Sequence, residues 1–394
     1  MLGTLQRSVD YSTSVSKFKF ILIIYSINAR IQFQNFPIPN FKILLVSKTF
    51  TYNKPFKLES GAVLNGFHLA YTTHGKLNTA KDNVVWIFHA LTANSDPSEW
   101  WGGLVGNDKF FDPKKYFIVC VNMPGSCYGS IGPFDVNPTT NNSWYHEFPW
   151  FTTRDMVRTY QHLKNSLGIK KIHIGIGGSM GGQQLLEWNI EEPTLFEYIF
   201  PIATNAFHSA WGVAFNASQR FAIENDATWK NKDVDAGLDG MKTARSIALL
   251  SYRSYDTYKL TQKITSGNLN SNERGAESYQ NYQGEKLAKR FNAFSYYFLS
   301  KGMDNHNVGR NRESAEKALS SIKAKALVIG ISSDLLFPLI EQEFLAAHIP
   351  HAEYRAIHSP YGHDGFLLEY EQIEEAIKTF LFNKVEETSK VTAL

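Results

Sequence analysis

Short, continuous runs of hydrophobic residues recur through the chain, and polar or turn-forming residues separate them. Runs of this length suit strands that are buried on both faces of a mostly parallel sheet. We predict such strands over residues 84–88, 116–121, 172–176, 198–202 and 326–331, and a further strand over 354–357. Before them, residues 56–58 and 67–71 alternate between apolar and polar positions, which predicts two antiparallel strands joined by a turn at Ser60-Gly61.

Between these runs, apolar residues recur at the spacing of an α-helix. One set recurs at spacings of four, three and four, which predicts a helix over residues 152–167. Thr152 stands three positions before Asp155, a pattern typical of a helix N-terminus. Further helices are predicted directly after Ser179 and near the C-terminal end. The residues expected to face the core in these helices are Met156, Tyr160, Leu163, Leu167, Leu185, Trp188, Ile373, Ile377, Phe380 and Leu381.

Strands that alternate with helices predict a doubly wound α/β sheet. The alternation stops at about residue 204 and resumes at about residue 321, and the stretch between is polar, rich in tyrosine and mostly helical in pattern, as over 240–252 and 285–299. Such an insertion indicates a helical cap over the carboxyl ends of the strands, where ligands bind in these sheets. We therefore predict a main domain over 49–203 and 321–385, a cap over 204–320, and an extension over 1–48 that is disordered or precedes the true start.

The composition narrows the class of protein. Hydrophobic residues make up 43% and charged residues 20% of the chain, as is typical of a soluble globular protein with a large core. A net charge of +3 is too small to indicate nucleic acid or an anionic membrane as a partner. The longest early apolar run, residues 20–25, is too short to span a membrane. Cys120 and Cys127 complete neither a disulfide scaffold nor a metal site, so we expect a reduced, cytoplasmic setting and no metal.

A candidate nucleophile stands at a strand-to-helix turn. The predicted strand over 172–176 runs into Gly177-Gly178-Ser179-Met180-Gly181 and then into a helix. A serine on such a turn presents its hydroxyl above the sheet, and flanking glycines remove side chains that would clash. The alternative is a glycine-rich turn that binds phosphate or only packs. The position after a buried strand favours Ser179 as a nucleophile, and the glycine spacing does not fit a dinucleotide motif.

Two later loop residues would complete a catalytic triad. Asp334 follows the last long apolar run, and His363 lies in a Gly-His-Asp-Gly segment before the final helix. The order serine, acid, histidine is that of the α/β-hydrolase fold. We expect His363 to take the hydroxyl proton of Ser179 and Asp334 to hold the imidazole. Taken singly, the aspartate could instead cap a helix and the histidine could belong to a turn; His351 and His358 are competing bases without the Gly-His-Asp-Gly setting.

An acyl-enzyme also needs donors for the oxyanion that forms on the substrate carbonyl. One is expected from the N–H of Met180, the residue after the nucleophile. We assign the second to Leu91, in the segment His89-Ala90-Leu91-Thr92 that follows the strand over 84–88. The alternative is that this segment is only a transition from strand to loop.

With these residues in place, the chain resembles the homoserine O-acetyltransferase family of methionine biosynthesis over about residues 52–382. The resemblance implies a ping-pong reaction in which acetyl-CoA acylates the serine, CoA leaves and the L-homoserine hydroxyl takes the acetyl group. It also implies that no cofactor is bound and that two copies form a homodimer through the cap. The matching blocks are HALT at 89–92, GSCYGSIGP at 125–133, GGSMGG at 177–182, LEW at 186–188 and YGHDGFL at 361–367.

The resemblance assigns substrate contacts as well. It implies that Arg245 binds the substrate carboxylate, that Tyr252 lies near the substrate and that Asp364 meets the substrate ammonium. One fixed cation and one fixed anion suit a zwitterionic amino acid. Without the resemblance, the sequence around Arg245 predicts only a solvated helix face. Leu336 stands where succinyl-using relatives tend to carry an arginine, which favours acetyl as the acyl group. Pro124 departs from the family pattern at the expected edge of the pocket.

Three alternatives stay open. An esterase or amidase would share the triad and give the acyl group to water. A succinyl donor or a serine acceptor would keep the transferase class. A non-catalytic binding protein could use the same fold, but the intact triad argues against it.

Overall fold

The computed structural model describes residues 47–262 and 275–392. The extension expected over residues 1–48 lies outside them except for its last two residues, and Lys48 already begins a strand.

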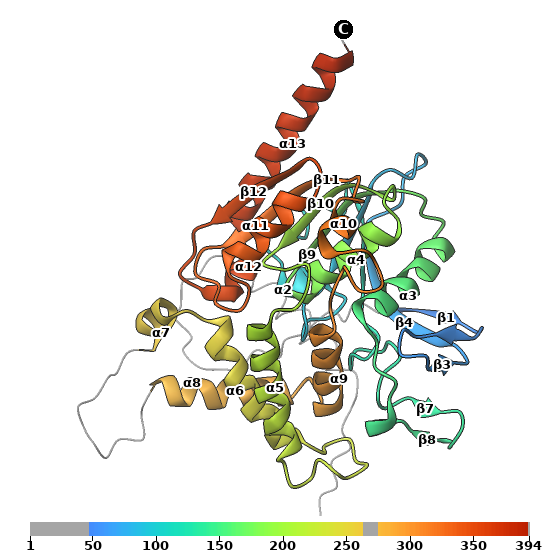
Figure 1. Cartoon of the computed structure of the whole chain (residues 1–394), viewed down its shortest axis with the longest axis vertical. Coiled ribbons are helices and arrows are strands. Elements are labelled where there is room, and N and C mark those ends of the chain that lie inside the picture. The colour runs from blue at the N-terminus through green and yellow to red at the C-terminus, as the bar shows by residue number, and fades with distance from the viewer. Residues whose placement is uncertain (1–46, 263–274, 393–394) are drawn as a thin grey trace, which may run out of the picture. The chain divides into compact units, whose positions relative to one another are not determined.

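The central sheet has eight strands in the order β1-β4-β6-β5-β9-β10-β11-β12 (Figure 1). β1 (Lys48–Tyr52) and β4 (Phe67–His74) lie antiparallel at one edge. The other six strands are parallel: β6 (Phe117–Val121), β5 (Val84–Phe88), β9 (Ile172–Gly178), β10 (Phe196–Ile202), β11 (Lys325–Ile331) and β12 (Ala352–Ile357). Each predicted buried run is therefore confirmed as a strand.

The predicted pairing of residues 56–58 with 67–71 is wrong. β2 (Phe56–Lys57) pairs instead with β3 (Val63–Leu64), because the turn at residues 60–61 returns the chain at once onto its own preceding strand. β4 pairs with β1 and β6. β1 carries no buried run, since it lies at the edge of the sheet and its side chains are exposed or half-buried.

Helices cover both faces of the parallel strands. α3 (Thr153–Ser166), α4 (Met180–Glu191) and α11 (Leu339–His348) pack on one face, and α13 (Tyr370–Thr392) packs on the other. The predicted capping pattern of α3 is confirmed, since Thr152 and Asp155 exchange side-chain to backbone hydrogen bonds. Shorter elements are α2 (Pro97–Trp100), β7 (Val136–Asn137), β8 (Asn142–Ser143), η2 (Tyr145–Glu147), η3 (Gly362–Asp364) and α12 (Gly365–Leu368).

The insertion between β10 and β11 is helical. The pattern predicted over 285–299 is divided between two helices, because the Asn292 side chain caps a new helix by accepting from Ser295 N at 2.8 Å. The indole of Trp211 donates to Leu335 O at 2.7 Å, so the insertion contacts the loop after β11. The helices are α5 (Ala210–Glu224), α6 (Leu238–Tyr252), α7 (Tyr255–Thr261), α8 (Gly275–Ala288), α9 (Ala293–Asp304) and α10 (Ala315–Leu319). Helices α5 to α9 lie at one end of the sheet, whereas α10 lies beside α4 (Figure 1).

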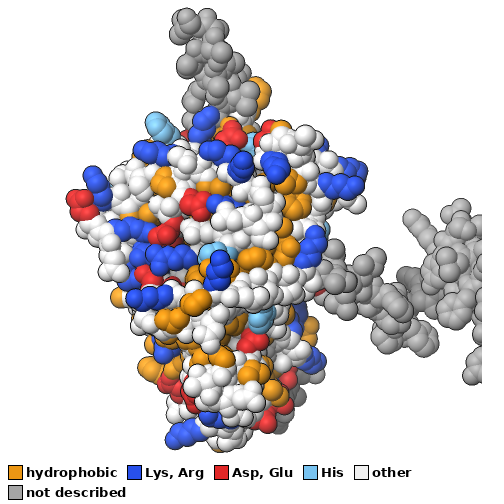
Figure 2. All heavy atoms as spheres, turned by 90° about the vertical axis from the view of Figure 1, so that its right-hand side faces the viewer, with side chains coloured by type: hydrophobic (Ala, Val, Ile, Leu, Met, Phe, Trp, Pro, Cys, Tyr) orange, Lys and Arg blue, Asp and Glu red, His pale blue; other side chains and the backbone are white. Residues whose placement is uncertain are grey.

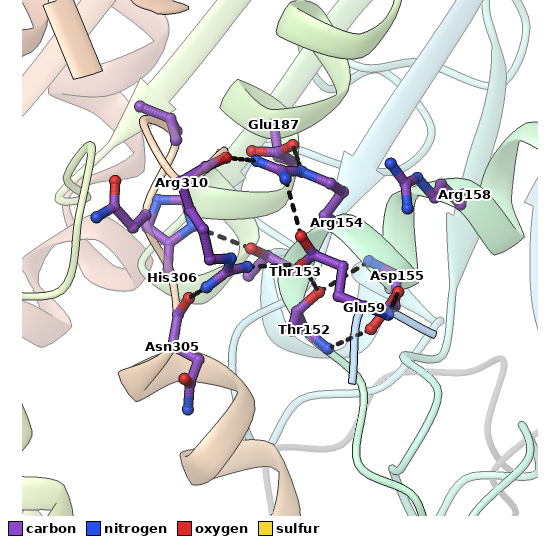
Figure 3. A network of polar contacts seen from close by, with 12 residues as sticks. Glu59, Thr152, Thr153, Arg154, Asp155, Arg158, Glu187, Asn305, His306 and Arg310 are labelled. Carbon is purple, nitrogen blue, oxygen red and sulfur yellow. Dashed lines mark hydrogen bonds and ion pairs between the residues drawn. The ribbon is translucent and has the colours of Figure 1, made fainter. Parts of the chain in front are cut away.

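A partly buried network of ion pairs holds the chain where it returns from the insertion to the sheet (Figure 3). Arg154 of α3 lies between Glu59, at 2.8 Å, and Glu187 of α4, at 2.6 Å. Arg310, in the segment after α9, pairs with Glu59 at 2.6 Å. Removing one partner of such a group would leave an uncompensated buried charge. The network therefore ties the end of the insertion to the helix that follows Ser179.

Figure 2 shows one face on which positive and negative side chains are interspersed, with small hydrophobic patches between them. Among the described residues, no helix is both long and apolar enough to cross a membrane. Within the same residues, no group of three or more His, Cys, Asp or Glu side chains is arranged to hold a metal ion.

Candidate active site

Ser179 occupies the turn between β9 and α4. Its backbone has φ 57° and ψ −128°, a conformation that non-glycine residues rarely adopt and that is typical of a strained nucleophile turn. A Cβ on Gly181 would lie 2.2 Å from Phe88 O, so this residue must be glycine for the helix to start so close to β5. Ser179 is 5% exposed, and its hydroxyl makes no hydrogen bond to another residue that the structure describes.

Two polar residues after β10 brace this turn, and the sequence did not identify them. The Thr204 hydroxyl donates to Ser179 O at 2.8 Å, and the Gln342 amide of α11 donates to Thr204 O at 2.7 Å. Asn205 accepts from Gln183 of α4 at 3.0 Å. All four side chains are buried. The only signal in the sequence is that a polar pair directly follows an apolar strand, which by itself does not distinguish a brace from a loop.

Asp334 and His363 lie in contact at the carboxyl ends of β11 and β12. His363 Nδ1 is 2.6 Å from Asp334 Oδ2, and the two residues are 3% and 5% exposed. Asp334 Oδ1 accepts from Leu336 N at 2.8 Å and from Phe337 N at 2.9 Å, so the aspartate also holds its own loop. The Phe337 ring stacks on the imidazole with centroids 5.0 Å apart. The carboxylate and the ring are therefore fixed before any ligand binds.

The Phe366 side chain lies beside both the imidazole and the turn that carries Ser179. The Phe366 ring lies 5.2 Å from the His363 ring, and it is also the nearest neighbour that a Cβ on Gly178 would meet. One aromatic ring thus borders both the turn at Ser179 and the histidine. In the described part of the chain His363 Nε2 has no hydrogen-bond partner, and catalytic contacts are often long before substrate binds. His351 and His358, the competing bases, are both exposed.

The loop after β5 is held by a buried histidine. Met123 N donates to His89 Nε2 at 3.1 Å, so His89 Nδ1–H donates to Ala90 O at 2.9 Å. Burial lowers the pKa of His89 to about 4, which keeps the ring neutral. Leu91 lies in this loop, and its N–H makes no hydrogen bond within the described ranges. Met180 is the first residue of α4, where N–H groups have no partner inside the helix.

The three residues expected to contact substrate gather beside His363. The Tyr252 ring lies 5.7 Å from the His363 ring, and the Arg245 guanidinium lies 5.3 Å from the centre of the Tyr252 ring. Asp364 Oδ2 is 3.1 Å from Arg253 Nη2, so without ligand this carboxylate pairs with a residue that the sequence did not single out. Burial raises the pKa of Tyr252.

A second acid, which is half-buried, lies near the pair. Glu341 of α11 accepts from Asn205 at 2.9 Å. Burial raises the pKa of Glu341 to about 7, although hydrogen bonds from Asn205 and Ser209 favour its charged form, and the charge of Asp334 adds to the rise. The folded-state pKa therefore lies above the ordinary value of 4.5. For an acid this means that charging opposes folding, so stability falls as the pH rises from about 4.5 to about 7.

Glu341→Gln is expected to stabilise the protein more at pH 8 than at pH 5, because glutamine cannot acquire a charge at this half-buried position. We expect the difference in free energy of unfolding between variant and wild type to grow by about 1 kcal/mol between these pH values, after allowance for solvent screening. Urea unfolding at both pH values measures it. Glu343→Gln, at an exposed position of the same helix, is the control. An equal difference at both pH values would contradict the burial of a titrating carboxyl.

Comparisons with known proteins agree with this geometry. The family described as alpha/beta hydrolase fold matches residues 83–370. The chain is 46% identical over 346 residues to the homoserine O-acetyltransferase of Cyclobacterium marinum, which covers 88% of this chain and 98% of that protein. The crystal structure of homoserine O-acetyltransferase from Bacillus anthracis has a TM-score of 0.77 and 24% identity, over 85% of this chain and 97% of that one. Esterase E22 has the same TM-score with 22% identity, over 85% and 99%. These two likenesses show the fold alone.

Proposed function

Because the chain belongs to the homoserine O-acetyltransferase family of the α/β hydrolase fold, we propose that it transfers an acetyl group from acetyl-CoA to the hydroxyl of L-homoserine. The observation that carries the chemistry is the buried 2.6 Å contact between His363 and Asp334 at the strand ends beside Ser179. The choice of substrates rests on the 46% identity to the relative from Cyclobacterium marinum.

In the first half-reaction the Ser179 hydroxyl attacks the thioester carbonyl, and His363 Nε2 takes its proton. The carbonyl oxygen becomes an oxyanion that accepts hydrogen bonds from the N–H groups of Leu91 and Met180. The carbon–sulfur bond then breaks and the proton passes from His363 to the departing thiolate, leaving acetyl-Ser179 and free CoA. Asp334 holds Nδ1–H throughout and stabilises the imidazolium.

In the second half-reaction the hydroxyl of homoserine takes the place of the serine hydroxyl. His363 removes its proton while the oxygen attacks the acetyl carbonyl, the same two N–H groups hold the oxyanion, and Ser179 leaves with the proton returned to it. The products are O-acetylhomoserine and the free enzyme. The reaction is therefore a ping-pong exchange at one serine, in a site that must exclude water.

Arg245 and Asp364 are proposed to hold the two charged ends of homoserine. Among the described residues Arg245 is in no ion pair, and it lies against the Tyr252 ring beside the imidazole. Its planar guanidinium can pair with a carboxylate through two hydrogen bonds. Asp364 would accept a hydrogen bond from the ammonium through Oδ1, because its Oδ2 pairs with Arg253. Tyr252 would lie between the amino acid and His363.

We propose acetyl as the transferred acyl group because of Leu336. This residue follows Asp334 by two positions and is 2% exposed. A succinyl group would bring a second carboxylate to an apolar side chain, and a buried charge without a partner is costly. We further propose that residues 204–320 act as a cap that excludes water, that two copies pair through it, and that the enzyme works in the cytoplasm.

Intact mass after mixing with acetyl-CoA alone tests the function. We expect one added acetyl group on Ser179, its loss when L-homoserine is added, and far less labelling from succinyl-CoA. Thiol release that requires homoserine would support transfer. Brisk release of thiol and acetate without homoserine would support an esterase instead, and the absence of any adduct would contradict an acyl-enzyme.

A further inference from the structure

Three basic residues that have no carboxylate partner among the described residues stand close in sequence at the end of α8. Lys286, Lys289 and Arg290 are exposed, and they stand three and four positions apart, a spacing that places side chains on one face of a helical turn. The turn continues past the helix, since Lys289 N donates to Glu285 O at 3.2 Å. None of the three basic groups is in an ion pair with another residue of the described ranges, while Glu285 pairs with Lys242 at 3.0 Å.

Arg290 links this cluster to the loop that carries Leu91. Its Nη1 donates to Thr92 O at 2.5 Å and to the Tyr128 hydroxyl at 2.6 Å. Thr92 directly follows Leu91, whose N–H is proposed to hold the carbonyl oxygen of the acyl donor. The Arg290 guanidinium therefore contacts the residue next to Leu91, the proposed oxyanion donor.

Most of the guanidinium remains available to a ligand. Both described contacts of the Arg290 side chain use Nη1, and the side chain is exposed. The free edge of an arginine pairs well with the oxygens of a phosphate, and lysines add charge to the same region. Homoserine does not need this cluster, because Arg245, which lies against the Tyr252 ring, is proposed to bind its carboxylate.

We propose that Arg290, Lys286 and Lys289 bind the phosphate groups of the acyl-CoA donor. This inference rests on the proposed function, in which the donor carries phosphates at the far end of a flexible arm from its thioester. Charge at the rim of the site would draw the anionic donor toward the loop of Leu91 and hold its nucleotide end. Contacts between exposed charges are screened by salt, so the binding is expected to weaken as ionic strength rises.

The test compares two acetyl donors, acetyl-CoA and the thioester S-acetyl-N-acetylcysteamine, which has no phosphate. Arg290→Gln removes the charge and leaves an amide donor on a shorter side chain. We expect its KM for acetyl-CoA to rise about 10-fold, as for loss of one charge-assisted hydrogen bond. We expect the other constants to stay within about twofold of the wild-type values. These are the KM for the short thioester, the KM for homoserine and the kcat with either donor.

A double variant separates charge from loop contact. Lys286→Glu with Lys289→Glu leaves the bonds of Arg290 in place, and we expect it to raise the KM for acetyl-CoA about 10-fold or more without affecting the short thioester. The matched control is Lys317→Glu with Lys323→Glu, two exposed lysines in and after α10, which is expected to leave both donors unchanged. In the wild type, added salt is expected to raise the KM for acetyl-CoA only.

Two results would overturn the inference. The first is an unchanged KM for acetyl-CoA in both cluster variants. The second is an equal loss with both donors, which would mean that the cluster only supports the loop. A wild-type protein that transfers acetyl groups to homoserine from neither donor would overturn the proposed function itself, so the two failures are distinguishable.

Discussion

Replacing Ser179 by alanine is expected to abolish acetyl transfer, lowering kcat/KM by about 10⁴-fold or more. The variant loses the atom that forms the covalent bond, and no neighbouring hydroxyl stands on the turn between β9 and α4 to replace it. The intact mass of the variant is expected to stay unchanged in acetyl-CoA. Stability is expected to change by about 1 kcal/mol or less, because the hydroxyl makes no hydrogen bond to another described residue.

Ser218→Ala is the matched control, since Ser218 is exposed on α5 and its hydroxyl bonds only within that helix. It is expected to keep wild-type kinetics. Thermal unfolding of both variants shows whether the alanine at position 179 has disturbed the fold. Measurable turnover by a folded Ser179→Ala variant, above what trace wild-type enzyme explains, would move the nucleophile to another residue.

Five of the six parallel strands were predictable because most of their residues are buried, so that each sequence contains a continuous apolar run. β9 and β10 are such runs, and both extend by two residues beyond the prediction. The edge strand β1 was missed for the opposite reason: its exposed side chains leave no apolar signal. The break between α8 and α9 depends on how Asn292 accepts from Ser295 N, a local geometry that helical periodicity does not record.

The site residues that could be predicted are those that local sequence patterns mark. Ser179 stands on a turn with a recognisable glycine pattern, and Asp334 and His363 follow strands, so the sheet brings them to one edge. The structure places the last two in contact, whereas their roles remain proposals. The support from Thr204 and the Arg253–Asp364 pair could not be predicted, because each joins segments far apart in the chain through single polar contacts.

Asp334→Asn is expected to reduce kcat by about 10³- to 10⁴-fold while the protein stays folded. The reason lies in the two oxygens of the carboxylate. Oδ1 accepts from two backbone N–H groups, those of Leu336 and Phe337, and Oδ2 contacts His363 Nδ1. The backbone donors require an oxygen at the first position, so the asparagine amide must turn its NH₂ toward the imidazole.

That orientation forces the wrong tautomer on His363. Nδ1 would then accept a hydrogen bond, the proton would move to Nε2, and Nε2 could no longer take a proton from Ser179. A single-turnover measurement is therefore expected to show slow acetylation of Ser179, in contrast to Ser179→Ala, where the adduct is absent. Asp108→Asn, an exposed acid that pairs with Lys114, is expected to leave the rate unchanged. An Asp334→Asn variant that retains acetylation within threefold of wild type would mean that the observed pair does not activate the serine.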